Sequence, residues 1–310
     1  MPLHTDYRPN TLEDFIGNRT VKSSITNLLK KDNPPHTYLL TGPSGCGKTT
    51  LARILANQLN CEGFNLKEIN CSNQRKLEDA RDIINKTRMK GLGGGNKGWI
   101  LDEFHLFGEG GNSSKNKPQN SLLKVLEEPP QHCYFFLCST DPQMILSTIR
   151  SRCTELEVEK LTSKSCKQLL SSTCKKIGAD VPDDVLNQIA KNSDGMPRQA
   201  LTILEKIVDL PERQMLRAAK QELNVESKSI DLCKALIARN SWGKVSKILK
   251  GLNEDPETIR RNVLGYASSV LLNGKESAYL IMDAFREPFY NTGKPGLILA
   301  CYEALEVDDG

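Results

Sequence analysis

The sequence predicts an α/β fold built on a parallel β-sheet, followed by regions that are helical. Short apolar stretches alternate with amphipathic segments over residues 37–154, and this alternation favours a parallel sheet covered by helices on both faces. A glycine-rich segment at residues 41–49 joins the first apolar stretch to a helical pattern. After Cys153 the periodicity becomes helical. In such sheets a ligand binds at the carboxyl ends of the strands.

The elements follow in chain order. Strands are expected at residues 37–41, 66–70, 98–102 and 133–138, with helices through residues 51–59, 77–84 and 121–128. Ser163 and Pro182 mark the starts of two further helices, and Pro197 precedes a third at residues 198–207. Breaks at residues 253–256, 273–274 and 293–296 divide the last helical stretch. These boundaries predict three domains, at residues 1–157, 158–210 and 211–310.

The glycine-rich segment fits the phosphate-binding pattern G-x-x-x-x-G-K-S/T. Glycines let backbone N–H groups converge on one anion, and the following helix adds the positive end of its dipole. Lys48 would contact the β- and γ-phosphates, and the Thr49 hydroxyl would bind Mg²⁺. A turn that merely matches the pattern is the alternative, but the flanking strand and helix favour binding of a nucleoside triphosphate, which the resemblance described below identifies as ATP. The expected contacts are Gly42, Pro43, Ser44, Gly45, Cys46, Gly47, Lys48, Thr49 and Thr50.

A second apolar strand ends in two adjacent carboxylates, Asp102 and Glu103. Asp102 would complete the Mg²⁺ site with Thr49, and Glu103 would orient or deprotonate the attacking water. Such a pair is common at strand ends, but its place downstream of a phosphate-binding loop favours catalysis.

Composition narrows the class of protein. The net charge of +4 is too mild to indicate nucleic-acid binding, so DNA contacts would need a local basic patch. The ten cysteines are scattered, which favours buried, reduced thiols over a zinc site. No signal segment or membrane-spanning run is present in the sequence, so we expect a soluble cytoplasmic protein that does not bind membranes.

Further motifs resemble those of the clamp-loader ATPases of the AAA+ superfamily, in the family's order over residues 7–205. They are Tyr7-Arg8-Pro9 with Phe15-Ile16-Gly17, Asp102-Glu103-Phe104-His105, the segment from Asn120 to Pro130, Ser139-Thr140-Asp141, Ser151-Arg152-Cys153 and Gly195-Met196-Pro197-Arg198. Residues 211–310 match only in being helical. The resemblance implies an AAA+ P-loop NTPase with a parallel sheet, a small helical lid domain and an all-α collar domain.

The resemblance also implies roles for residues outside the phosphate loop. Tyr7, Arg8 and Ile16 would contact the adenosine of ATP, or form a small apolar anchor instead. Thr140 would hydrogen-bond the attacking water or γ-phosphate, and Arg198 would reach the phosphates from the lid. Arg152 would act as an arginine finger on the ATP of an adjacent subunit. A strand-end cap, a surface ion pair and a structural salt bridge are the respective alternatives for these three.

DNA contact is a further implication. Arg75 and Arg81 lie in the segment whose helix start faces DNA phosphates in this family, and Lys124 could add to the same channel. Such contacts position the backbone without reading sequence. A solvated, charged helix face is the alternative.

Two departures from the bacterial subunits, the missing four-cysteine zinc module and a longer segment at residues 108–118, favour a divergent or phage-like subunit, which would act in the host cytoplasm. The expected partners are other loader subunits in a ring or spiral, most simply a pentamer, a sliding clamp and primer–template DNA. The rival functions are another AAA+ DNA-processing ATPase, of the branch-migration helicase or replication-initiator type, and a loader subunit that does not hydrolyse ATP. The intact Lys48, Thr49, Asp102 and Glu103 argue against the last.

Overall fold

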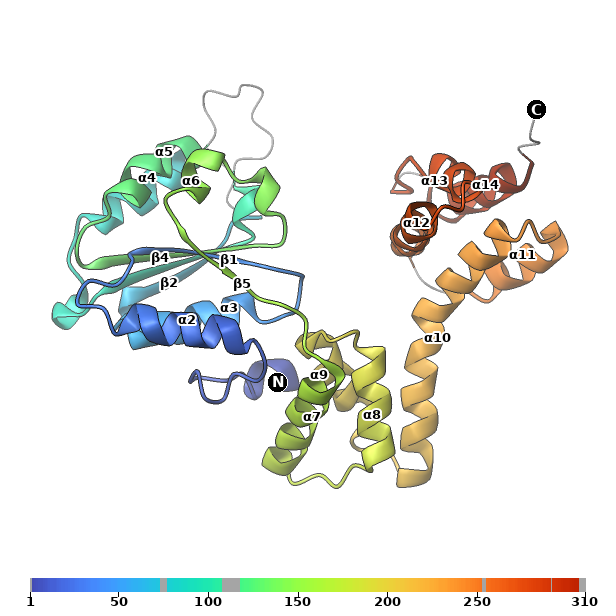
Figure 1. Cartoon of the computed structure of the whole chain (residues 1–310), viewed down its shortest axis with the longest axis horizontal. Coiled ribbons are helices and arrows are strands. Elements are labelled where there is room, and N and C mark those ends of the chain that lie inside the picture. Colours follow the sequence, from blue (N-terminus) through green and yellow to red (C-terminus); the bar gives the residue numbers. More distant parts are fainter. Residues whose placement is uncertain (1, 73–76, 108–117, 253–254, 291, 307–310) are drawn as a thin grey trace. The chain divides into compact units, whose positions relative to one another are not determined.

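The computed structural model describes residues 2–72, 77–107, 118–252, 255–290 and 292–306. These residues form two compact units, Met1–Glu212 and Arg213–Gly310, which are taken separately below (Figure 1). The predicted sites Arg75 and most of the segment at residues 108–118 lie outside the described residues.

The first unit contains a five-stranded parallel sheet with the order β2-β3-β4-β1-β5. Its strands are β1 (Thr37–Thr41), β2 (Leu66–Asn70), β3 (Lys97–Asp102), β4 (Cys133–Ser139) and β5 (Thr154–Glu157). β1 and β4 are buried along their whole length, as expected for central strands covered on both faces. The register pairs Thr41 with Ser139 and Asn70 with Asp102, so the carboxyl ends of four strands meet at one edge.

Helices cover both faces of this sheet (Figure 1). On one face lie α2 (Arg19–Leu29) and α3 (Lys48–Gln58), whose Ile25, Leu51 and Leu55 join Tyr38 and Leu40 in one core. On the other lie α4 (Leu77–Thr87), α5 (Pro118–Glu127) and α6 (Ser147–Arg150), which bury Ala80, Leu122 and Ile149. Short 3₁₀ helices occupy Gly63–Asn65, Leu92–Gly94, Phe104–Leu106 and Pro142–Met144.

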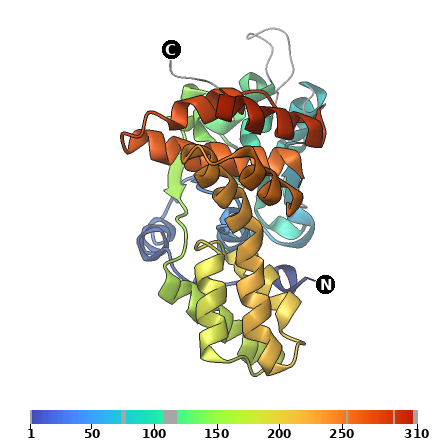
Figure 2. The same ribbon diagram turned by 90° about the vertical axis from the view of Figure 1, so that its right-hand side faces the viewer.

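Three helices follow the sheet within the first unit: α7 (Ser163–Ile177), α8 (Asp183–Asn192) and α9 (Pro197–Ile207). Thr162 caps α7 by accepting a hydrogen bond from the Ser165 amide, and Gly178 ends it in the left-handed conformation. The N-terminal α1 (Leu3–Asp6) packs against α9 (Figure 2). This contact brings the start of the chain to the three-helix region, although α1 and α9 lie far apart in the sequence.

The described part of the second unit is helical, with α10 (Glu212–Ile237), α11 (Trp242–Lys250), α12 (Pro256–Leu272), α13 (Ala278–Ala284) and α14 (Gly293–Glu306). Its core includes Leu236, Val245, Val263, Phe285 and Cys301. Asp255 caps α12 by accepting a hydrogen bond from the Thr258 amide.

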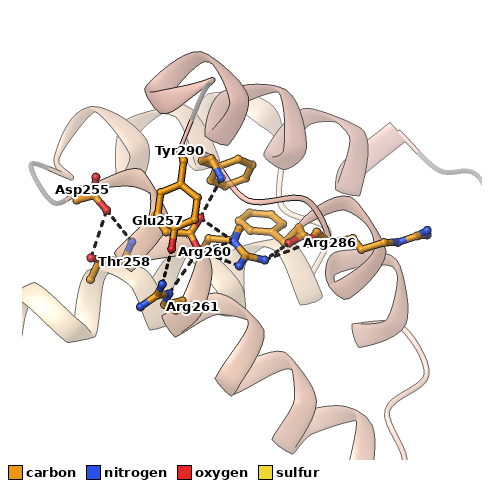
Figure 3. A network of polar contacts seen from close by, with 9 residues as sticks. Asp255, Glu257, Thr258, Arg260, Arg261, Arg286 and Tyr290 are labelled. Carbon is orange, nitrogen blue, oxygen red and sulfur yellow. Dashed lines mark hydrogen bonds and ion pairs between the residues drawn. The ribbon is translucent and has the colours of Figure 1, made fainter. Parts of the chain in front are cut away.

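A buried polar network ties α12 to the segment after α13 (Figure 3). The Glu257 side chain is 6% exposed and pairs with the Arg260 guanidinium at 2.8 Å. It also accepts a hydrogen bond of 2.9 Å from the Phe289 amide. Arg260 donates in turn to the Phe285 carbonyl, and Arg261 donates to the Tyr290 hydroxyl. The network fixes the chain path between α13 and α14.

The predicted α/β class and the helical C-terminal part are confirmed. β5 was not expected, and the predicted break at residues 293–296 is wrong because α14 begins at Gly293. Pro295 then falls in the first helical turn, where its missing amide costs no hydrogen bond. All ten cysteines are free, and all except Cys153 are buried. Among the described residues no helix is both long and apolar enough to cross a bilayer. The division of the first unit at residue 157 stays a prediction.

Candidate active site

The phosphate loop connects β1 to α3 and depends on glycine at two positions. Gly42 has a φ of 136°, and a Cβ there would lie 2.1 Å from the Val158 carbonyl oxygen. Gly47 has a φ of 108°, and a Cβ there would lie 3.1 Å from the Phe15 ring. Side chains at either position would therefore clash or strain the backbone. The loop can close tightly over the sheet only with these glycines.

Lys48 and Thr49 open α3 and face the loop and β3 respectively. Lys48 is 6% exposed, and its ammonium donates hydrogen bonds of 2.9 Å to the carbonyls of Gly42 and Pro43. An ammonium has three donor positions, so one remains for an anion beside the loop. The Thr49 hydroxyl donates a 3.0 Å hydrogen bond to Asp102 Oδ2. The two predicted Mg²⁺ ligands are therefore in direct contact.

Glu103 follows β3 in the left-handed conformation, with a φ of 51°. Its amide donates to Asp102 Oδ1 at 3.1 Å, and its Oε2 accepts a 3.3 Å hydrogen bond from the Thr140 hydroxyl. His105 Nδ1 lies 3.5 Å from the same Oε2 and 3.2 Å from the Ser139 hydroxyl. A non-glycine residue at positive φ is uncommon and often marks a functional position. The carboxylate is thus held between the ends of β3 and β4.

A pocket of about 300 Å³ lies over this edge of the sheet. The phosphate loop, Asp102 and Glu103 line it, together with apolar and polar residues of the N-terminal segment and of the helices after the sheet. Its lining is His4, Tyr7, Arg8, Pro9, Asp14, Phe15, Ile16, Ser44, Gly45, Cys46, Gly47, Lys48, Thr49, Thr50, Asn70, Asp102, Glu103, Leu161, Leu169, Pro197, Arg198 and Leu201.

Two arginines bring positive charge to the pocket. The Arg198 amide donates a 3.3 Å hydrogen bond to the Gly45 carbonyl, so the start of α9 touches the phosphate loop. Arg8 is half-buried, and its pKa is lowered first by burial and then by the nearby positive charge of Arg53. Arginine remains charged in proteins at neutral pH despite such a shift. The pocket can therefore attract a polyanion.

Comparisons with known proteins identify the family. A model of the Holliday junction DNA helicase RuvB P-loop domain matches residues 7–90, and a model of the DNA polymerase III delta subunit matches residues 72–162. The DNA polymerase III gamma subunit of Buchnera aphidicola subsp. Schizaphis graminum is 30% identical over 276 residues, covering 79% of this chain and 74% of that protein. The chain belongs to the DNA polymerase III gamma/tau family of clamp-loader AAA+ ATPases.

Other relatives of this family are longer than the chain. The tau subunit of Bacillus subtilis is 28% identical over 338 aligned residues, which cover 99% of this chain but 54% of that protein. The tau/gamma subunit of Haemophilus influenzae is 30% identical over 234 residues and is covered to 33%. The chain thus spans about half or less of these two proteins.

Solved structures confirm the AAA+ fold. The RuvB branch migration motor of Thermotoga maritima superposes with a TM-score of 0.60 at 23% identity, covering 74% of this chain and 79% of that one. At this identity the likeness concerns the fold alone.

Most of the residues that were expected to bind ATP line the pocket, including Tyr7, Arg8, Ile16 and Arg198. Gly42 and Pro43 are not among its lining residues; their carbonyls accept hydrogen bonds from Lys48 instead. Thr140 is also outside the lining but contacts it through Glu103. The roles of all these residues in a gamma/tau-type ATPase stay predictions.

Arg152 lies away from the pocket, in the turn after α6. Its guanidinium pairs with Glu127 at 2.9 Å and donates a 2.6 Å hydrogen bond to the Thr148 carbonyl. Arg81 on α4 and Lys124 on α5 are exposed, and Arg75 lies outside the described residues. The structure therefore brings none of these described basic residues to the site.

Several pocket residues could not be predicted from the sequence. They are His4 in the N-terminal segment, Leu161 before the first helix after the sheet, and Leu169 and Leu201 within segments predicted only to be helical. An apolar residue on an amphipathic helix carries no signal that distinguishes a pocket wall from core. Asn70 could have been predicted, because it is a polar residue at the end of a predicted strand, and that strand pairs with the one that ends in Asp102.

Proposed function

We propose that this chain is an ATP-hydrolysing subunit of a loader that opens a sliding clamp and places it on primer–template DNA. ATP binding would drive clamp opening and the grip on DNA, and hydrolysis would release both. The observation that carries the proposal is one unbroken series of contacts from Thr49 through Asp102 and Glu103 to Thr140, beside a pocket rimmed by the phosphate loop. Membership of the gamma/tau family supports the proposed role in clamp loading.

The residues present fit ATP and Mg²⁺. Lys48 is buried and positively charged, and its two hydrogen bonds go to neutral carbonyls, so it lacks a negative partner among the contacts seen here. A buried charge of this kind is stabilised by an anion. The Thr49 hydroxyl and the Asp102 carboxylate are oxygen ligands of the type that Mg²⁺ prefers. When bound, Mg²⁺ would neutralise charge on the phosphate oxygens.

Different residues of the chain would bind the phosphates and activate the attacking water. Lys48 and the loop amides would bind and orient the phosphates, while Arg8 and Arg198 would add positive charge from the N-terminal segment and α9. Glu103 would orient the attacking water or accept its proton, and Thr140 would hold the Glu103 carboxylate in place.

Assembly into a ring or spiral is part of the proposal, and α14 supports it. Leu297, Ala300 and Cys301 of α14 are buried within the second unit. The other side of the helix exposes Ile298, Leu299 and Tyr302, which are 39%, 57% and 41% exposed. Exposed apolar residues gathered on one side of a helix mark a surface for contact with another protein. The second unit would therefore serve as the collar that joins subunits.

The test separates binding from turnover. Lys48→Ala should abolish tight ATP binding, because it removes the buried charge that faces the phosphates. Glu103→Gln should keep ATP affinity but lower turnover by about 100-fold or more, because a general base acts in the transition state. Equilibrium binding and steady-state hydrolysis measure the two effects, with the exposed Lys31→Ala and Glu62→Gln as controls. Wild-type turnover by Glu103→Gln would contradict the assigned role.

A branch-migration motor is the second candidate, supported by the match to the RuvB P-loop domain model and by the shared fold. A clamp loader should hydrolyse ATP faster with primed DNA and a sliding clamp together than with a four-way junction. Stimulation by the junction alone would favour the second candidate.

A further inference from the structure

His4 presents a buried nitrogen without a partner at the wall of the nucleotide pocket. Its Nδ1 is among the few side-chain polar atoms of the described residues that are buried and make no hydrogen bond. The others belong to Tyr38, Trp99 and Arg150, which do not line this pocket. Buried polar groups nearly always have a partner, so an exception in a binding pocket points to a ligand atom.

The surroundings of His4 identify which part of a nucleotide would reach it. α1 packs against α9, whose Leu201 lines the same pocket, whereas the phosphate loop meets α9 at Arg198. His4 and Tyr7 are three residues apart and therefore leave α1 on the same side. Together with Ile16 and Leu201 these residues add apolar surface to the pocket lining, whereas Lys48 and Thr49 add its phosphate-binding groups. Apolar walls with few polar groups suit a purine base.

We infer that His4 Nδ1 accepts a hydrogen bond from the exocyclic amine of adenine and thereby favours ATP over nucleotides that carry an oxygen at the same ring position. The inference rests on the proposed function of this pocket as an ATP site. In the neutral tautomer with its proton on Nε2, Nδ1 is an acceptor. The N6 amine of adenine donates, whereas O6 of guanine or hypoxanthine can only accept. While the ring keeps this tautomer, an oxygen facing the Nδ1 lone pair leaves both atoms unsatisfied.

The size of the discrimination follows from the loss of this hydrogen bond. A purine base that lacks the exocyclic amine, with nothing in its place, should bind about fivefold more weakly than adenine, which is the usual net effect of one neutral hydrogen bond. A base with an oxygen in place of the amine should bind roughly tenfold or more weakly than adenine, because this oxygen and His4 Nδ1 then both remain buried and unpaired. The purine ring itself keeps its apolar contacts in either case.

The experiment is a cycle between the His4 side chain and the base. Mg²⁺-dependent dissociation constants are measured by calorimetry for ATP, inosine triphosphate and purine riboside triphosphate, which lacks any group at the ring position of the amine. The wild type should prefer ATP over purine riboside triphosphate about fivefold. His4→Phe should bring this ratio close to one, chiefly by weakening ATP. His4→Asn should retain part of the preference, because its amide oxygen is as many bonds from Cα as Nδ1.

Three controls separate the base contact from other effects. Thr5→Ala changes an exposed residue of the same helix and should behave as the wild type. Asp14→Ala tests a second acceptor of the pocket lining, whose carboxylate already accepts a hydrogen bond from the Thr11 hydroxyl. The ratio of 2′-deoxy-ATP to ATP should not change in His4→Phe.

The outcomes are distinct. A wild-type ratio near one, an unchanged ratio in His4→Phe, or a loss of preference in Asp14→Ala instead would overturn the inference. A changed 2′-deoxy ratio would assign His4 to the ribose and overturn it as well. A wild type that binds none of the triphosphates would overturn the proposed function of the pocket, and the inference with it.

Discussion

At the scale of residues, Glu257 shows how a single buried charge can hold a helical unit together. Its pKa is lowered to about 2, first by hydrogen bonds from Arg260 and further by the Phe289 amide, although burial alone would raise it. The Arg260 side chain is itself only 13% exposed. Removing one partner of such a pair leaves the other buried without compensation.

Glu257→Gln should therefore destabilise the second unit by about 3 kcal/mol at neutral pH. The unfolded carboxyl has its ordinary pKa of 4.5, above the folded value, so its stabilisation is complete above pH 4.5 and lost as the pH falls towards 2. The variant should lack this part of the acid dependence. Urea unfolding followed by Trp242 fluorescence in a Trp99→Phe background reports on the second unit. Equal acid sensitivity of Glu257→Gln and the exposed control Glu276→Gln would contradict the prediction.

Residue types in the site could be predicted from sequence, but their conformations could not. The phosphate pattern identified Lys48 and Thr49 because the chemistry of the loop constrains its sequence. Nothing in the sequence indicated the left-handed backbone of Glu103 or the contact of His105 with its carboxylate. Both depend on how β3 and β4 end side by side, which is a tertiary property.

At the scale of elements, α4 and α5 carry the described residues that were expected to contact DNA. Arg81 and Lys124 are exposed. If they face DNA phosphates, reversing their charge should weaken binding to primed DNA of any sequence. Each lost phosphate contact should also reduce the slope of log K against log salt by about 0.9 for duplex DNA.

We predict this outcome for Arg81→Glu and Lys124→Glu, alone and together, measured by fluorescence anisotropy over a range of salt. Lys176→Glu on α7 makes the same change of net charge at an exposed site and serves as the control. Variants that all shift the affinity equally, with an unchanged salt slope, would place Arg81 and Lys124 on a solvated face.

The apolar face of α14 gives a second prediction at this scale. Leu299→Glu should reduce self-association or association with partner subunits, because it places a charge in a surface that assembly would bury. Sedimentation over a range of concentrations measures it. Leu272 at the end of α12 is 89% exposed, so Leu272→Glu tests whether any exposed apolar residue has the same effect. Equal behaviour of the two variants would remove α14 from the interface.

Elements with strong periodicity were predictable and marginal ones were not. β1, β3 and β4 are apolar runs, as central parallel strands must be, whereas β5 has Leu156 as its buried residue and pairs only with β1 in the described sheet. An edge strand has one neighbour, so a sequence alternating with glutamates can form it. Gly293 and Pro295 predict a helix break because both residues disfavour helix interiors, yet both are acceptable in a first turn.

At the scale of the whole molecule, the position of Arg152 raises the question of assembly. Arg152 and Glu127 form an ion pair whose side chains are 34% and 51% exposed. A pair this exposed contributes little to stability, roughly 0 to 1 kcal/mol. The guanidinium is therefore available to a stronger anion, such as the phosphates bound by an adjacent subunit. The motif Ser151-Arg152-Cys153 is visible in the sequence, but the anion that Arg152 would contact is present only in an assembly.

If Arg152 completes a neighbour's site, turnover should rise with subunit concentration, and Arg152→Ala should lower turnover far more than ATP affinity. Loss of an arginine finger typically costs about 10³–10⁵ in phosphoryl transfer, and less where Thr140 and Arg198 still act. The decisive measurement mixes Arg152→Ala with Lys48→Ala, which has a disabled pocket but an intact arginine. Each variant alone should be nearly inactive, whereas the mixture should regain activity where an intact pocket meets an intact Arg152. Glu127→Gln should stay active, because it removes only the partner within the chain. Mixed assemblies without any rescue, over a range of ratios, would confine Arg152 to its own subunit or to a structural role.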